Sequence, residues 1–139
     1  MPRAPVPTVV AEFLAEPHPA VIASSREDCA PHSAPTWYDW EDGRVLVNGD
    51  HTRRRVEYLR EGAPVSLTVL DGGSWYHHVT VEGSVDEVRR DDGLRDIDRL
   101  STRYLGQPFG NRESVRVSMW IRVERWHGWN GGRPWPPRD

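Results

Sequence analysis

Cysteine is nearly absent from this chain of 139 residues, and lysine is missing altogether. The single Cys29 cannot build an internal disulfide framework, which excludes the small disulfide-stabilised secreted folds. The longest apolar runs, such as residues 19–23, are far shorter than the roughly 20 residues that a membrane-spanning helix needs. No early stretch joins a basic flank to an unbroken apolar run, so no secretory signal is indicated. We therefore expect a cytoplasmic protein with no membrane partner.

A strong net charge is also lacking, because 18 basic residues are set against 21 acidic residues, which gives −3. A nucleic-acid-binding protein would normally carry a strongly positive surface, so no nucleic-acid partner is expected. All 18 basic residues are arginine. Each cationic contact is therefore a planar guanidinium, which suits phosphate or carboxylate. The length is that of one domain.

Short β-type segments separated by turn residues dominate the pattern, and three amphipathic segments accompany them. The expected helices cover residues 9–15, 50–61 and 91–105. Gly83 lies in the middle of a long expected strand and would permit a bulge. This arrangement predicts a mainly β fold, a small antiparallel barrel with peripheral helices. The six expected strands are residues 20–25, 32–40, 44–48, 65–70, 75–88 and 114–126.

One domain is expected over residues 1–127, of which residues 1–7 form an N-terminal arm whose alternating prolines forbid a helix. Residues 128–139 show neither helix nor strand periodicity and are expected to form an irregular tail. The rings of Trp129 and Trp135 in that tail are available to dock on another surface.

Common catalytic and metal-binding signatures are missing. The chain contains no Gly-rich nucleotide loop, no zinc-protease motif and no Cys-x-x-Cys pair. His77 and His78 are neighbours on an expected strand and therefore point to opposite faces, so no metal site is predicted. Cys29 is interpreted as a turn thiol. Asp91 and Asp92 are interpreted as helix-capping residues rather than as an acid and base pair.

Residues 48–55 are the one segment with a clear binding signature. A strand ends there, Gly49 lets a ligand approach the backbone, and a helix begins among three arginines. Free amides of a first helical turn and arginine side chains both favour anions. A solvated, charged helix face explains the same pattern, and Asp50 opposes an anion unless it caps the helix or pairs with an arginine.

Seven segments, in this order and spacing, resemble the split-barrel flavin and deazaflavin family related to pyridoxamine 5′-phosphate oxidase. The resemblance covers nearly the whole chain and is strongest to the branch that uses coenzyme F420. It implies a six-stranded antiparallel split barrel of the FMN-binding type. The segments are FLAEP (13–17), PHSAPTW (31–37), GRVLVN (43–48), RRRVEYL (53–59), VSLTVLD (65–71), VTVEG (79–83) and IDRLSTRYLG (97–106).

The resemblance also implies a homodimer with a cofactor groove between its subunits. Arg53 and Arg55 fall on the family's phosphate-binding positions. Gly49 stands where the family commonly has a hydroxyl residue, and Thr52 would supply that hydroxyl. The remaining residues implied to bind the cofactor ring are Pro35, Thr36, Trp37, Val47, Asn48 and, on the opposite wall, Trp75.

The activity that the resemblance implies is hydride transfer between reduced F420 and an electron-poor C=C, C=N or C=O bond of a small molecule. The cofactor supplies this chemistry and the protein orients it. No side chain is assigned as catalytic, although Tyr76 and His78 are weak candidates for a proton donor. Two alternatives stay open. One is an FMN-binding oxidase or reductase of the same fold, and the other is a non-catalytic carrier or pseudoenzyme, which the departures at Gly49 and Tyr58 allow.

Overall fold

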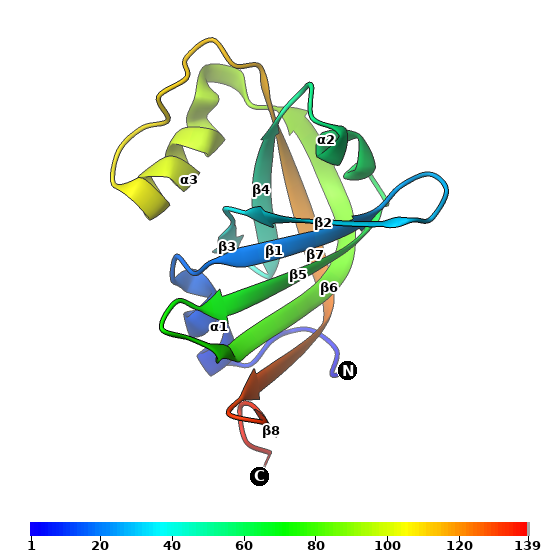
Figure 1. The fold of residues 1–139 in the computed structure, drawn as a ribbon, viewed down its shortest axis with the longest axis vertical. Helices are drawn as coiled ribbons and strands as arrows, with labels where there is room; N and C mark the ends of the chain where they lie inside the picture. The colour runs from blue at the N-terminus through cyan, green and yellow to red at the C-terminus, as the bar shows by residue number, and fades with distance from the viewer. Residues whose placement is uncertain (139) are drawn as a thin grey trace.

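The computed structural model describes residues 1–138 and consists mainly of antiparallel strands (Figure 1). The mainly β architecture with peripheral helices, predicted from the sequence, is confirmed. The helices are α1 (Thr8–Ala15), α2 (Arg54–Tyr58) and α3 (Arg95–Leu105), and the short 3-10 helix η1 (Asp92–Leu94) precedes α3. The strands are β1 (Ala20–Ser25), β2 (Pro31–Thr36), β3 (Asp39–Glu41), β4 (Arg44–Asp50), β5 (Pro64–Asp71), β6 (Ser74–Arg90), β7 (Arg116–Asn130) and β8 (Arg133–Pro134).

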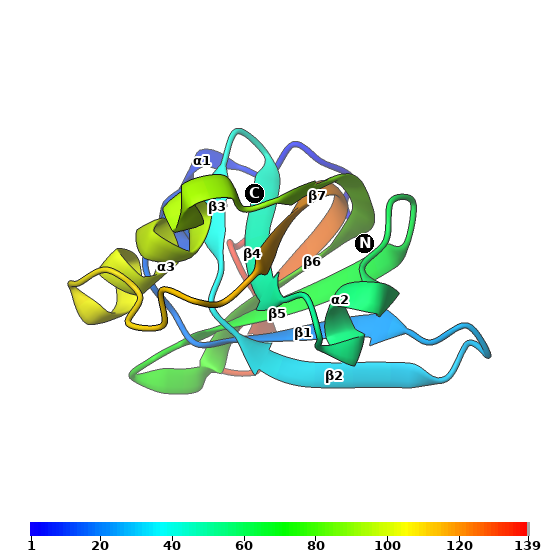
Figure 2. The same ribbon diagram turned by 90° about the horizontal axis from the view of Figure 1, so that it is seen from above.

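All strands belong to one sheet, in the order β2-β1-β5-β6-β7-β4-β3, with β8 paired to the end of β7. Seen from above, the sheet curls around a central core (Figure 2). Alternate residues of β1 and β5 point inward, as the strict burial alternation of both strands shows. The core is mainly aliphatic, and Val47, Leu67, Val79 and Met119 are among its most buried members.

The single strand expected over residues 32–40 is divided in two. β2 pairs with β1, whereas β3 pairs with β4 through the turn at Asp42 and Gly43. The chain changes direction at Trp37 and Tyr38, because the fully buried Tyr38 turns inward and its hydroxyl donates to the carbonyl of Leu14 at 2.8 Å. β4 therefore has β7 and β3 as its neighbours, and it does not pair with β2.

Gly83 lies at an irregularity in the pairing of the two longest strands. β6 and β7 change register between Glu82 and Gly83, so that one residue of β7, Glu124, has no partner on β6. A Cβ atom at Gly83 would collide with the carbonyl oxygen of Arg122. The close approach of the two backbones, rather than an unusual backbone angle, is what requires glycine here.

Helix α3 is anchored at both ends. Near its C-terminus the Arg103 guanidinium donates to the carbonyls of Ala15 (2.6 Å) and Glu16 (2.7 Å). These carbonyls at the C-terminal end of α1 thus obtain a hydrogen-bond partner. At its N-terminus the buried Asp91 carboxylate accepts hydrogen bonds from the amides of Asp96 and Ile97, both at 2.9 Å. Asp91 is thus the capping residue that the sequence suggested.

The C-terminal segment is more ordered than the sequence indicates. β7 continues to Asn130, past the expected boundary at residue 127, and β8 turns back to pair with it. Trp135 packs against Phe13 and His77, whose ring centroids lie 5.8 and 4.5 Å from its own. No helix among residues 1–138 is long and apolar enough to cross a membrane.

Replacing Gly83 by Ala tests the close contact between β6 and β7. We expect Gly83→Ala to lower the free energy of unfolding by about 3 kcal/mol, because the new methyl group meets backbone that cannot move aside. Gly110→Ala is the matched control, since a Cβ there would meet nothing within 4 Å. Urea unfolding measures both changes, and equal stability of the two variants would contradict the assignment.

Replacing Asp91 by Ala tests the anchor of α3. We expect Asp91→Ala to cost about 3 kcal/mol of unfolding free energy, because it leaves buried donors without an acceptor. Asp92→Ala is the control, since the Asp92 side chain is 88% exposed and should contribute less than about 0.5 kcal/mol. A loss below 1 kcal/mol for Asp91→Ala would show that the anchor matters little.

Candidate functional site

A cavity of about 550 Å³ lies between α3, the loop that follows it, and the edges of β1, β2 and β4. Residues 35–37, where the chain passes from β2 towards β3, are part of its lining. Its volume is within the range typical of small-molecule sites. One end is apolar and is lined by Pro17, Pro19, Trp37, Leu100 and Tyr104, and Phe109 lies between these residues and Arg116.

Aromatic rings form the wall of the apolar end. Trp37 stacks on Tyr104 with ring centroids 5.6 Å apart and an interplanar angle of 10°, and Phe109 meets Trp37 edge-on. The Tyr104 hydroxyl donates to the carbonyl of His18 at 2.7 Å, which fixes the ring, and burial raises the pKa of this phenol. The wall is therefore a rigid surface suited to a flat ring.

Two arginines define the other end of the cavity. Arg55, from α2, donates to the carbonyl of Asn48 at 3.1 Å and weakly to that of Pro35 at 3.4 Å. Arg116, from the start of β7, donates from Nε to Oδ1 of Asn48 at 2.7 Å. Its guanidinium also lies over the Phe109 ring, 4.7 Å from the centroid.

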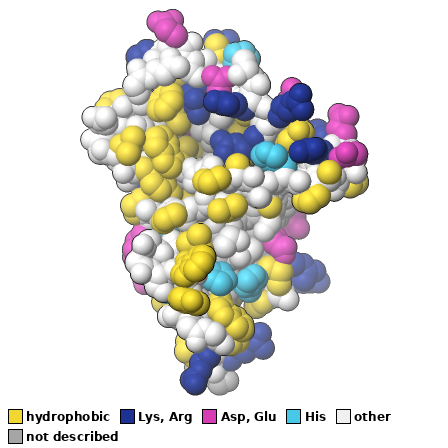
Figure 3. All heavy atoms as spheres, in the orientation of Figure 1, with side chains coloured by type: hydrophobic (Ala, Val, Ile, Leu, Met, Phe, Trp, Pro, Cys, Tyr) yellow, Lys and Arg dark blue, Asp and Glu magenta, His cyan; other side chains and the backbone are white. Residues whose placement is uncertain are grey.

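Both guanidiniums are half-buried, and within residues 1–138 neither has a carboxylate at ion-pair distance. Burial lowers the pKa of Arg55 from its ordinary value, and the charges of Arg116 and Arg53 lower it further. Burial is also the main cause of the lowered pKa of Arg116. In the space-filling view, basic side chains gather around the hollow between α3 and α2 (Figure 3). This end of the cavity therefore favours an anion.

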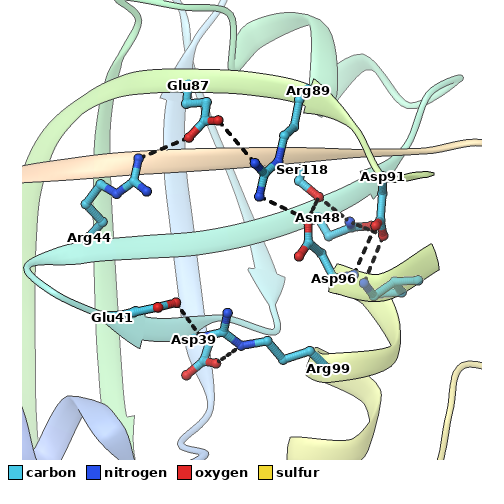
Figure 4. A network of polar contacts seen from close by, with 11 residues as sticks. Asp39, Glu41, Arg44, Asn48, Glu87, Arg89, Asp91, Asp96, Arg99 and Ser118 are labelled. Carbon is cyan, nitrogen blue, oxygen red and sulfur yellow. Dashed lines mark hydrogen bonds and ion pairs between the residues drawn. The ribbon is translucent and has the colours of Figure 1, made fainter. Parts of the chain in front are cut away.

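Asn48 connects this end of the cavity to the frame of the fold (Figure 4). Its side-chain amide donates to Asp91 at 3.0 Å and to Ser118 at 3.1 Å, so its oxygen is turned toward Arg116. Ser118 in turn donates to Asp96 of α3 at 2.6 Å. The orientation of Arg116 is thus coupled to the capping of α3.

Of the residues assigned to the cofactor from the sequence, five line the cavity: Pro35, Thr36, Trp37, Asn48 and Arg55. Val47 is buried in the core behind them. Gly49 is buried under α2, and a Cβ there would lie 2.6 Å from the Val56 side chain and 3.7 Å from Arg55. Glycine at this position therefore allows α2, and with it Arg55, to lie close to β4.

Thr52 and Arg53 lie at the exposed turn before α2, outside the cavity lining. The Thr52 hydroxyl donates to Asp50 at 2.6 Å, and Ser114 donates to the same carboxylate at 2.9 Å. These bonds hold the pKa of Asp50 far below its usual range. Asp50 thus fixes the turn, and the hydroxyl of Thr52 is engaged with it. α2 has only five residues, shorter than the helix expected over 50–61.

Trp75, Tyr76 and His78 lie on β6, outside the cavity. Trp75 and Tyr76 are 71% and 65% exposed near the tip of the β5–β6 hairpin. His78 points to the outer face of the sheet, and its Nδ1 lies 3.3 Å from the carbonyl oxygen of Trp75. His77, on the opposite face, packs against Phe13. Within the described chain, no group of three His, Cys, Asp or Glu side chains could hold a metal ion.

Sequence reasoning missed Arg116 and the contribution of α3 and its following loop. Arg116 lies opposite Asp50 in the β4–β7 register. Predicting that the last strand pairs with β4 would therefore have placed Arg116 beside the arginine-rich segment 48–55. Leu100 and Tyr104 lie in the helix expected over residues 91–105, but no sequence signal showed that this helix borders a cavity.

Comparison with solved structures identifies the same architecture. An F420 reductase superposes with a TM-score of 0.76 at 21% identity, covering 87% of this chain and 98% of its own. A FAD- and heme-binding protein from Mycobacterium smegmatis gives a TM-score of 0.68 at 18% identity, with coverages of 95% and 75%. A putative pyridoxamine 5′-phosphate oxidase from Lactobacillus delbrueckii gives 0.63 at 14% identity, with coverages of 91% and 98%.

These similarities confirm the predicted split-barrel fold. A search of curated proteins finds no match. The sequence model described as "Pyridoxamine 5′-phosphate oxidase" matches residues 6–130, which is most of the chain and includes every strand through β7. The chain therefore belongs to the pyridoxamine 5′-phosphate oxidase family.

Proposed function

We propose that this protein is an F420-dependent oxidoreductase that holds its cofactor in the cavity between α3 and the sheet. The observation that carries the proposal is the division of one cavity into an aromatic end and a cationic end. A flat ring system joined to a phosphate has the same two parts. The structural similarity to an F420 reductase, at 21% identity, supports the choice of deazaflavin over flavin.

The residues present fit such a cofactor. Trp37 offers a face for the ring, and the half-buried Arg55 and Arg116 lack the carboxylate partners that arginines in such surroundings usually have. Two positive charges match a phosphate dianion, and arginine forks suit its oxygens. Gly49 fits this arrangement, because the missing side chain lets Val56 pack against β4 and so brings α2, with Arg55, close to the cavity.

When bound, the reduced deazaflavin supplies a hydride to an electron-poor C=C, C=N or C=O bond. The chain binds and orients: Trp37 and Tyr104 fix the plane of the ring, and Arg55 fixes its phosphate end. The side chain of Leu100 adds an apolar surface beside these rings. Tyr76 and His78 reach such a site only if a second copy of the chain brings them there, since both lie outside the cavity of their own chain.

We further propose that the active form is a homodimer joined through the outer face of the sheet. Across β1, β5 and β6 this face carries mostly small, half-buried side chains, and Figure 3 shows few charges along its middle. Burial and the nearby His78 lower the pKa of His127 on the same face. Large exposed rings flank it, namely Trp75, Tyr76 and Trp129.

Cofactor binding tests the proposed function. We expect the purified protein to bind F420 saturably and more tightly than FMN, as measured by equilibrium dialysis at physiological salt. Trp37→Ala should weaken binding about tenfold, because the ring loses its stacking surface. Val9→Ala, which removes an exposed apolar side chain of α1 outside the cavity and away from the outer face of the sheet, is the control. Preference for FMN would assign the protein to the flavin-dependent alternative. Binding of neither would contradict cofactor binding and leave a different ligand or a pseudoenzyme.

Light scattering after size exclusion tests the homodimer. We expect twice the 15.9 kDa mass of one chain, and we expect Thr68→Arg to give monomers, because it places a charge in the middle of the outer face. Thr102→Arg makes the same change on the exposed side of α3 and should leave the dimer intact. A monomeric wild-type protein, or a Thr68→Arg dimer, would refute this interface.

A further inference from the structure

Arg116 is the group in the cavity that the family resemblance does not assign. It comes from β7, about 60 residues after the arginine-rich turn, yet it ends beside Arg55. Both arginines are hydrogen-bonded to the same residue, since Arg55 contacts the backbone oxygen of Asn48 and Arg116 its side-chain oxygen. The two guanidiniums therefore flank one residue at one end of the cavity.

This arrangement is electrostatically unfavourable in the free protein. Two like charges are held close together and partly removed from water; Asp50 and Asp91 attract the Arg116 charge, but in residues 1–138 no carboxylate lies within ion-pair distance of either arginine. A bound dianion would offset the repulsion between the two guanidinium charges and the cost of their burial. The affinity for an anion therefore follows from the two neighbouring, partly buried guanidinium charges of the free protein.

The orientation of Arg116 leaves its outer nitrogens available. Nε is engaged with Asn48, and Nη1 makes only a long contact with Ser114 at 3.5 Å. In the described part of the chain, Nη2 donates no hydrogen bond. The Phe109 ring supports the guanidinium from one face, so its plane is set before a ligand arrives.

Arg53 differs from both. It is exposed, stands at the N-cap of α2 and does not line the cavity. We propose that Arg116, together with Arg55, forms the phosphate site of this cavity, and that Arg53 is peripheral to it. This inference rests on the proposed function in that it assigns the phosphate end of the cofactor, but the site binds free phosphate whether or not a ring occupies the apolar end.

The test compares four single substitutions that each remove one positive charge: R116Q, R55Q, R53Q and R26Q. Arg26 lies in the exposed β1–β2 turn and serves as the control. FMN, riboflavin and inorganic phosphate are the probes, and calorimetry measures each affinity. We expect R116Q and R55Q to weaken FMN and phosphate binding by about 10- to 100-fold, the loss of one charged hydrogen-bonding group. R53Q and R26Q should change either affinity by less than about threefold.

Riboflavin separates phosphate binding from effects on the ring or the fold, because it lacks the phosphate. R116Q should bind riboflavin within about threefold of the wild-type affinity. R116K keeps the charge without the planar fork and should lose less phosphate affinity than R116Q, with an unchanged melting temperature.

Two results would overturn the inference. In the first, R116Q binds phosphate with the wild-type affinity whereas R53Q loses phosphate affinity. In the second, R116Q loses as much affinity for riboflavin as for FMN. If the wild type binds phosphate but neither FMN nor F420, the proposed function fails, and the phosphate affinities of the four variants still decide the role of Arg116.

Discussion

The buried contact between Asp91 and Asn48 is the interaction on which the site depends. Asp91 caps α3, and through Asn48 it connects that helix to the middle of β4. Figure 4 shows Ser118 closing the same network from β7. Because one carboxylate satisfies several otherwise orphaned donors, the position of α3 over the sheet is fixed. The cavity exists because α3 is held at this place and not against the strands themselves.

The same network explains the chemistry of the cavity. Asn48 can present its oxygen to Arg116 only because its amide nitrogen is used by Asp91 and Ser118. The arginines are thereby held where burial works against their charge, and at Arg116 the charges of Asp50 and Asp91 offset this only in part. At the opposite end, the stacked pair of Trp37 and Tyr104 is rigid before binding. Affinity then follows from pre-organisation, because little remains to be ordered when the ligand arrives.

Much of the fold was predictable from local patterns. Alternation predicted β5, Gly83 predicted the bulge, and Asp91 was recognised as a capping residue. Of the site, the sequence pattern and the family resemblance indicated Trp37, Asn48 and Arg55, which do line the cavity.

The features that the sequence did not predict depend on contacts between distant segments. The break at Tyr38 depends on a hydroxyl bonded 24 residues away, and Arg116 meets Arg55 only through the β4–β7 pairing. Neither leaves a signal in its own segment, since such contacts are decided by tertiary packing.

A structure of the protein crystallised with F420 tests the central claim most directly. The account predicts phosphate oxygens that accept hydrogen bonds from both Arg55 and Arg116, with the deazaflavin ring against Trp37 at the apolar end of the cavity. Density for the cofactor elsewhere on the molecule, with the cavity between α3 and the sheet still open, would contradict it.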